Sequence, residues 1–123
     1  MPLDILIVDD SAAIRKILQR VLRQADVDVG QVYEAGDGLE ALETLKNHKV
    51  HLVLADVNMP NMNGMQLLAE IKSRAEFASL PVIMITTEGS QSKVMEAAQL
   101  GAAGYIRKPF SADQIKDKIS NLF

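Results

Sequence analysis

Short apolar runs alternate along the whole chain with longer segments of helical periodicity. The five candidate strands are Ile5–Val8, Gln31–Glu34, His51–Ala55, Val82–Ile85 and Tyr105–Arg107. Three of them are nearly unbroken apolar runs, which is typical of strands buried on both faces of a parallel sheet. The alternation therefore predicts an α/β fold in which each strand is followed by a helix.

The first segment between strands has apolar residues at the i, i+3, i+4 and i+7 spacing of one helix face. That stripe consists of Ile14, Ile17, Leu18, Val21, Leu22 and Ala25. The basic residues that fall away from it are Arg15, Lys16, Arg20 and Arg23. Such a face is most often simply solvated, and docking of a partner is the alternative interpretation.

The other segments carry recognisable helix ends. Helices are expected to begin near Asp37, after Gly64, near Ser92 and after Ser111. Gly101 ends the fourth, because glycine suits the position just past a helix. Glu40 and Gln114 each stand three residues after a helix start, placed for a capping box. The apolar residues of the second, third and fifth helices are Leu39, Leu42, Leu45, Leu67, Leu68, Ile71 and the inward-facing Ile115, Ile119 and Leu122.

Five strands alternating with five helices predict a doubly wound (βα)5 domain that covers residues 1–123. Right-handed crossovers leave few topologies for a parallel five-stranded sheet. The best fit among them is a flavodoxin-like order, 2-1-3-4-5.

Composition and charge exclude several classes of function. The 123 residues include no cysteine, which excludes disulfides, thiolate metal sites and thiol catalysis. The formal charge of −3 argues against nucleic acid as the main partner, since phosphate binding needs a basic surface. Neither a signal peptide nor an apolar run of the ~18 residues that span a membrane is present, so a cytoplasmic protein is expected.

Polar side chains follow four of the five candidate strands, where each strand ends. They are Asp9-Asp10, Asp56, Thr86-Thr87 and Lys108-Pro109, whereas the second strand is followed by Ala35-Gly36. In the 2-1-3-4-5 order these four strands are neighbours, and their carboxyl ends lie on one rim of the sheet. The sequence therefore predicts a single site on that rim.

The chemistry of this set favours a metal and a phosphoryl group. Two unit charges ~4 Å apart repel by about 4 kcal/mol at an effective dielectric of 20, so clustered carboxylates need a cation or raised pKa values. Oxygen ligands that include several carboxylates suit Mg²⁺. Lys108 adds a positive charge and Thr86 a hydroxyl donor, which would stabilise charge on a transferring phosphoryl group.

Four segments together resemble a response-regulator receiver domain in both order and spacing. They are Val8–Ser11, Asp56–Gly64, Ile85–Glu88 and Lys108–Phe110. Within that family the chain is similar to the single-domain chemotaxis regulators, through Asn58–Met62, Glu88 and Gly101–Tyr105. Asn63 departs from the Asp that the family usually has before Gly64. The substitution touches a loop position, and the chemical set remains complete.

The resemblance implies roles for the site residues. Asp56 would accept the phosphoryl group from a phosphohistidine on a histidine kinase or its phosphotransfer domain. Asp9 and Asp10 would hold Mg²⁺ with Asp56 and the backbone carbonyl of Asn58. Lys108 would pair with the phosphoryl oxygens, ahead of a cis peptide at Pro109.

The resemblance also implies a switch rather than an enzyme proper. Thr86 would turn toward the phosphoryl group, and Tyr105 would follow it inward. Asn58 and Glu88 would control how water reaches the acyl phosphate. The output surface, formed by the fourth helix, fifth strand and fifth helix, would bind a downstream protein, and the domain would act as a monomer.

Plainer interpretations accompany each residue. Asp9-Asp10 and Thr86-Thr87 could be ordinary strand ends, Pro109 an ordinary turn residue and Tyr105 a packing residue. His48 and His51 are expected on the surface far from the site. The methionines near Pro60, namely Met59, Met62 and Met65, are expected to pack adaptably in the loop.

Other functions also compete with the switch. A receiver that acts in another phosphorelay or belongs to a larger regulator is one alternative. A Mg²⁺-dependent aspartyl-phosphate phosphatase is another, although Asn58 stands where those enzymes want an acid. A flavodoxin-like binding module would need a phosphate-cradling loop where Asp9-Asp10 stands.

Overall fold

The sheet of the computed structural model, which describes residues 2–123, has the predicted topology. Its five strands are β1 (Leu3–Val8), β2 (Val29–Ala35), β3 (Leu52–Ala55), β4 (Val82–Thr86) and β5 (Gly104–Arg107). They are all parallel, in the order β2-β1-β3-β4-β5. The fold prediction is therefore confirmed.

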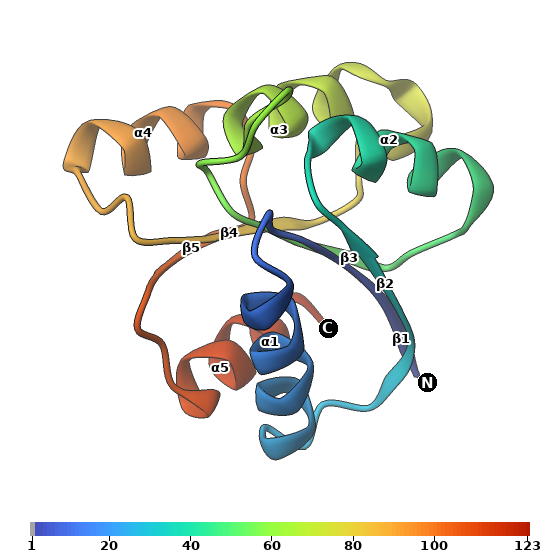
Figure 1. Cartoon of the computed structure of the whole chain (residues 1–123), viewed down its shortest axis with the longest axis vertical. Helices are drawn as coiled ribbons and strands as arrows, with labels where there is room; N and C mark the ends of the chain where they lie inside the picture. The colour runs from blue at the N-terminus through green and yellow to red at the C-terminus, as the bar shows by residue number, and fades with distance from the viewer. Residues whose placement is uncertain (1) are drawn as a thin grey trace.

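Helices cover both faces of this sheet (Figure 1). They are α1 (Ala12–Gln24), α2 (Gly38–Asn47), α3 (Gly64–Ser73), α4 (Gln91–Gln99) and α5 (Ala112–Leu122). α1 and α5 lie on one face, whereas α2, α3 and α4 lie on the other. A short 3₁₀ helix, η1 (Ala75–Phe77), was not expected from the sequence. None of the helices within residues 2–123 is long and apolar enough to cross a membrane.

Two hydrophobic cores result, one on each face. Leu18 and Leu22 of α1 and Ile115 and Ile119 of α5 join the residues of β1, β3 and β4 that point to their side. The helices of the other face contribute a second cluster that includes Leu42, Leu45, Leu67, Leu68, Ile71 and Ala97. The central strands β1, β3 and β4 are thus buried on both sides, which explains why they read as continuous apolar runs.

Several predicted boundaries differ by one or two residues. β1 and β2 begin two residues earlier than predicted, because Leu3 pairs with Val29 across the two strands. Gly30 and Gln31 of β2 are exposed at the sheet edge, so apolar pattern alone could not find this start. α4 begins at Gln91 rather than Ser92, because Ser90 is its N-cap and accepts a hydrogen bond from the amide of Lys93.

Three residues assigned to apolar stripes lie outside the cores. Ile17, Leu39 and Leu122 are all exposed, so the inward position predicted for Leu122 is wrong. Leu122 is the last residue of α5, whereas Ile115 and Ile119, nearer the start of the helix, are buried. Residues at the end or the flank of a helix can therefore have the spacing of a buried stripe and still be exposed.

The helix caps are mostly as predicted. Ser111 and Gln114 form a complete capping box on α5, and Gly101 follows α4 with a φ of 98°, a left-handed conformation that favours glycine. Asp37 caps α2, but the box predicted with Glu40 is incomplete. The Glu40 side chain accepts from the amide of Gly36, at 3.1 Å, instead of the amide of Asp37.

Candidate functional site

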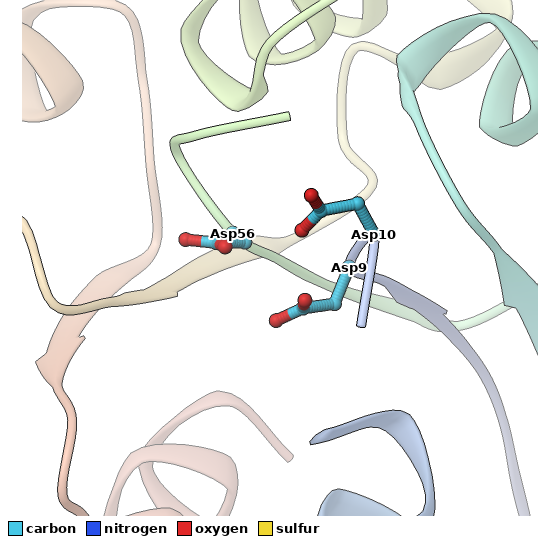
Figure 2. A group of neighbouring side chains, drawn as sticks. All are labelled: Asp9, Asp10 and Asp56. Atoms are coloured by element: carbon cyan, nitrogen blue, oxygen red, sulfur yellow. The ribbon is translucent and has the colours of Figure 1, made fainter. Parts of the chain in front are cut away.

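Three carboxylates meet beyond the carboxyl ends of β1 and β3. Figure 2 shows Asp9 and Asp10, just after β1, beside Asp56, just after β3. Each of the three offers a carboxylate oxygen, and these oxygens lie within 4.8 Å of one another. Asp9 and Asp56 are 2% and 8% exposed, whereas Asp10 is exposed. The convergence expected from the strand order is present.

Backbone hydrogen bonds continue the sheet through the two buried aspartates. The amide of Asp9 donates to the carbonyl of Ala35 at 3.0 Å, and the amide of Asp56 donates to the carbonyl of Val8 at 2.9 Å. The side chain of Asp9 also accepts from the amide of Ser11 at 2.9 Å. The two buried carboxylates thus follow directly on strand ends, and the hydrogen bonding of the sheet continues through their backbone.

Lys108 brings a positive charge into the cluster. Its Nζ lies 2.8 Å from Oδ2 of Asp9 and 3.6 Å from Oδ2 of Asp56. The amide of Lys108 donates to the carbonyl of Thr86 at 2.8 Å, which extends the pairing of β4 and β5. The following peptide, Lys108–Pro109, is cis, as expected.

Gly64 sits directly against the backbone of Asp56. A Cβ at this position would overlap the carbonyl oxygen of Asp56 and lie 2.8 Å from Cε of Met84. The amide of Gly64 also donates to the carbonyl of Val57 at 2.9 Å. Glycine is therefore required here for a close approach between the start of α3 and the end of β3.

Asn63, the departure from the family pattern, caps α3. Its side chain accepts from the amide of Gln66 at 2.9 Å, and Gln66 accepts from the amide of Asn63 at 2.9 Å. Asparagine is as good an N-cap as aspartate. The position is thus a helix cap rather than only a loop residue, and the substitution preserves its function.

Thr86 and Tyr105 are linked through the backbone of Glu88. Oγ1 of Thr86, which is fully buried, accepts from the amide of Glu88 at 3.1 Å. The hydroxyl of Tyr105 donates to the carbonyl of Glu88. Burial, together with the negative charges of Glu88 and Asp56, raises the pKa of Tyr105, so its hydroxyl stays protonated as a donor. Glu88 is therefore held from both sides.

Two of the basic residues on α1 are engaged within the molecule. Nε of Arg15 and Nζ of Lys16 each lie 2.9 Å from the carboxylate of Glu34 on β2. Hydrogen bonds from Lys16 and Arg15 lower the pKa of Glu34. Arg15 also donates to the carbonyl of Asp9, a contact that the sequence analysis missed. Helical spacing could not predict the contacts of Arg15, because Glu34 lies on β2 and Asp9 lies in a loop.

A second missed contact joins Asp37 to Asn61. Nδ2 of Asn61 donates to Oδ2 of Asp37 at 2.7 Å, across 24 positions of sequence. Asp37 was recognised only as a helix start, and Asn61 only as part of a family motif. No local pattern relates the two residues.

The remaining predicted residues lie away from the carboxylates or at the edge of the site. Asn58 is exposed, and its amide lies 3.5 Å from Oδ1 of Asp56. His48 stacks on Tyr33, and Nδ1 of His51 accepts from the amide of Asp4 at 2.9 Å. Met59 and Met62 are partly buried and pack against the core from the loop, as expected, whereas Met65 lies on α3 and is buried in the core.

The donor set fits a hard divalent cation. Three carboxylates with one ammonium leave a net negative cluster, and oxygen-only ligands match the preference of Mg²⁺. Asp10 faces solvent, so a metal held there could keep several of its waters.

Comparison with known proteins gives a consistent set of relatives. The family described as the response regulator receiver domain matches residues 5–120. The chemotaxis protein CheY-3 of Vibrio cholerae is 44% identical over 119 residues, 97% of this chain and 90% of that protein. The chemotaxis protein CheY of Pseudomonas aeruginosa is 40% identical over 119 residues, 97% of this chain and 94% of that protein.

Solved structures have the same fold. The chemotaxis protein CheY4 of Vibrio cholerae superposes with a TM-score of 0.87 at 30% identity, and each chain is covered completely. A putative response regulator of Chloroflexus aurantiacus gives a TM-score of 0.89 at 29% identity, with 99% of this chain and 98% of that chain covered.

Proposed function

This chain belongs to the response regulator receiver domain family, and on that premise we propose that Asp56 is its phosphoacceptor. Members of this family are generally phosphoacceptor switches rather than classical enzymes. The donor is a phosphohistidine of a histidine kinase or of its phosphotransfer domain. Because the relatives at 40–44% identity are named chemotaxis proteins, we propose that the chain acts in a chemotaxis pathway. The proposed location is the cytoplasm.

The observation that supports Asp56 most directly is its position between charges of both signs. The Nζ of Lys108 stands 3.6 Å away, and the carboxylates of Asp9 and Asp10 complete a metal-binding group on the same rim. Asp9 is already paired with Lys108 at 2.8 Å, and Asp10 is exposed. Asp56 is therefore the buried carboxylate that lies near both the ammonium and the metal-binding group without forming the tighter ion pair, which leaves it available to accept the phosphoryl group.

In the proposed transfer, an oxygen of Asp56 bonds to phosphorus while the P–N bond of the donor breaks. The electron pair of that bond returns to the imidazole, which takes up a proton. Mg²⁺, held by Asp9, Asp10, Asp56 and the Asn58 carbonyl, supplies charge neutralisation when bound. The Lys108 ammonium turns from Asp9 toward the new phosphoryl oxygens.

The later steps of the switch use residues at the edge of the site. Asn58 and Glu88 control the access of water and hence the rate at which the domain loses its own phosphoryl group. Thr86 and Tyr105 transmit the phosphorylated state to the surface formed by α4, β5 and α5. A downstream protein binds this surface, and the domain acts as a monomer.

Phosphoryl uptake from a small acyl phosphate tests this proposal. With Mg²⁺ present, intact-mass measurement should show one added phosphoryl group on the wild-type protein and none on Asp56→Asn. Asp117→Asn, an exposed position on α5, is the matched control and should be labelled normally. Excess chelator should abolish uptake. Equal labelling of Asp56→Asn would disprove the assignment, and full uptake with chelator would disprove the metal role.

A further inference from the structure

The carboxylate of Asp37 uses its two oxygens for two different purposes. Oδ1 accepts from the amide of Glu40 at 2.9 Å and caps α2. Oδ2 accepts from the side-chain amide of Asn61 at 2.7 Å, in the loop between β3 and α3. Asp37 is only 6% exposed. A single buried side chain thus joins a helix end to the loop that follows the phosphoacceptor.

The geometry of Asn61 suits this contact. Its φ is 65°, in the left-handed region that asparagine tolerates better than most residues. The neighbouring backbone adds a second link, because the amide of Gly38 donates to the carbonyl of Met62 at 3.0 Å. A Cβ on Gly38 would lie 2.6 Å from the side chain of Met62, so glycine permits this close approach.

The loop is otherwise held mainly at its ends. The amide of Gly64 bonds to the carbonyl of Val57 at 2.9 Å, and Asn63 caps α3. Between Val57 and Asn63, the described hydrogen bonds that join the loop to another element are those of Asn61 with Asp37 and of Met62 with Gly38, at the start of α2. The start of α2 therefore fixes the middle of the loop that carries Asn58.

We propose that Asp37 and Asn61 are positioning residues for the metal site, acting through the loop that presents the Asn58 carbonyl. The inference rests on the proposed function, in which that carbonyl is a Mg²⁺ ligand. Mg²⁺ demands nearly ideal octahedral geometry, so a displaced carbonyl weakens binding. Outer contacts that orient metal ligands have this effect in other metal sites, commonly by about tenfold or more in affinity.

A double-mutant cycle isolates the contact. Asp37→Ser keeps one oxygen for the α2 cap but cannot also reach Asn61, since serine is a good N-cap with a single side-chain oxygen. Asn61→Gly removes the amide while accepting a φ of 65°. Leu45→Val, in the core of α2, is the control for a general loss of stability.

Isothermal titration with Mg²⁺ should show affinity about tenfold weaker in Asp37→Ser and in Asn61→Gly. The double variant should be no weaker than the singles, because both remove the same contact. Phosphoryl uptake from acetyl phosphate should need more Mg²⁺ for half-saturation, yet reach nearly the wild-type rate at saturating Mg²⁺. Leu45→Val should lower the urea midpoint and leave Mg²⁺ affinity unchanged.

Wild-type Mg²⁺ affinity in Asp37→Ser and Asn61→Gly would overturn the proposal, as would a matching loss in Leu45→Val. Fully multiplicative losses in the double variant would show that the residues act separately. If Asp37→Ser does not fold, Asn61→Gly decides the question, since its position is exposed and accepts glycine. Failure of the wild-type protein itself to bind Mg²⁺ would instead refute the proposed function, and this inference with it.

Discussion

The Nζ of Lys108 lies closer to Asp9 than to the proposed acceptor, at 2.8 Å from Oδ2 of Asp9 against 3.6 Å from Oδ2 of Asp56. The side chain of Asp9 is almost fully buried, so this ion pair is poorly screened by solvent. Lys108 therefore neutralises a carboxylate that is also one of the proposed Mg²⁺ ligands. In the proposed mechanism, the lysine and the metal would compete for the same charge in the unphosphorylated protein.

Lys108→Met should consequently strengthen Mg²⁺ binding. Two unit charges ~5 Å apart interact by about 3 kcal/mol at an effective dielectric of 20, and the exposed side of the site screens part of this. We expect a gain in Mg²⁺ affinity of about tenfold, measured by isothermal titration calorimetry. Lys108→Arg keeps the charge and should change the affinity little. Weaker binding in Lys108→Met would mean that the ammonium orders the ligands rather than competing with the metal.

Gly64→Ala should destabilise the protein strongly. The new Cβ would overlap the Asp56 carbonyl oxygen, and backbone cannot move aside as a flexible side chain can. Overpacking of this kind lowers the free energy of unfolding by about 2 kcal/mol or more, which urea denaturation would measure. Gly36→Ala is the control, because its Cβ would lie 3.4 Å from a Glu40 oxygen and should change stability by less than about 1 kcal/mol. Equal effects at both positions would contradict the close approach.

The carboxyl of Asp37 should make stability depend on pH. The Asn61 amide, and next the Glu40 amide, hold the pKa of Asp37 below its ordinary value of 3.8. Because the folded pKa is depressed, this contribution is present above that ordinary value, which the unfolded chain has, and is lost as pH falls through the folded value. Urea midpoints measured from pH 5 to pH 3 should fall less steeply for Asp37→Ser than for wild type. Parallel profiles would show that Asp37 does not contribute.

Site residues whose positions depend on strand order were predictable from the sequence. Contacts that depend on the conformation of a loop were not. Asp9, Asp56 and Lys108 converge because parallel strands end on one rim, and the apolar runs that define β1, β3 and β4 are unambiguous. The contact between Asp37 and Asn61 depends on how a loop after β3 folds back onto α2. Nothing in local spacing encodes that geometry.

The limits of periodicity explain the other differences. β2 lies at the sheet edge, and the exposed Gly30 and Gln31 separate its first residue, Val29, from the rest of the strand, so the apolar pattern did not reach its start. Leu39 has the spacing of a buried position yet is exposed, because α2 meets the sheet on a narrower face than the pattern implies. Arg15 looked like a solvated residue, although it reaches both Glu34 and the carbonyl of Asp9.

The backbone of Glu88 offers a physical route from the site to the proposed output surface. Its amide is bound by Oγ1 of Thr86 and its carbonyl by the hydroxyl of Tyr105. A phosphoryl group on Asp56 would offer Thr86 a charge-assisted hydrogen bond, which is stronger than a neutral one. If Thr86 turned toward it, the Glu88 amide would lose its partner, and the loop that also anchors Tyr105 would have to rearrange.

The exchange of one hydrogen bond of Thr86 cannot supply enough free energy to complete the switch. A change from 1:99 to 99:1 requires about 5.5 kcal/mol of differential stabilisation, whereas a hydrogen bond to a charged group contributes about 1.5–3 kcal/mol. Movement of Lys108 from Asp9 to the phosphoryl oxygens, together with loop repacking, must supply the rest. We therefore expect a graded population shift, with some active conformer present before phosphorylation.

Nuclear magnetic resonance with beryllofluoride as the phosphoryl mimic tests this route. Chemical-shift changes should reach Tyr105 and residues 93–100 of α4 and its end, and should shrink in Thr86→Ala. Thr87→Ala is the matched control, because Thr87 is exposed while Thr86 is fully buried, and it should respond as wild type does. Changes confined to the loops around Asp9, Asp56 and Lys108 would rule out Thr86 and Tyr105 as the link. If the chemical-shift changes at Tyr105 are as large in Thr86→Ala as in wild type, Thr86 is not needed for the coupling. The ring of Tyr105 would then be coupled to the site through Glu88 alone.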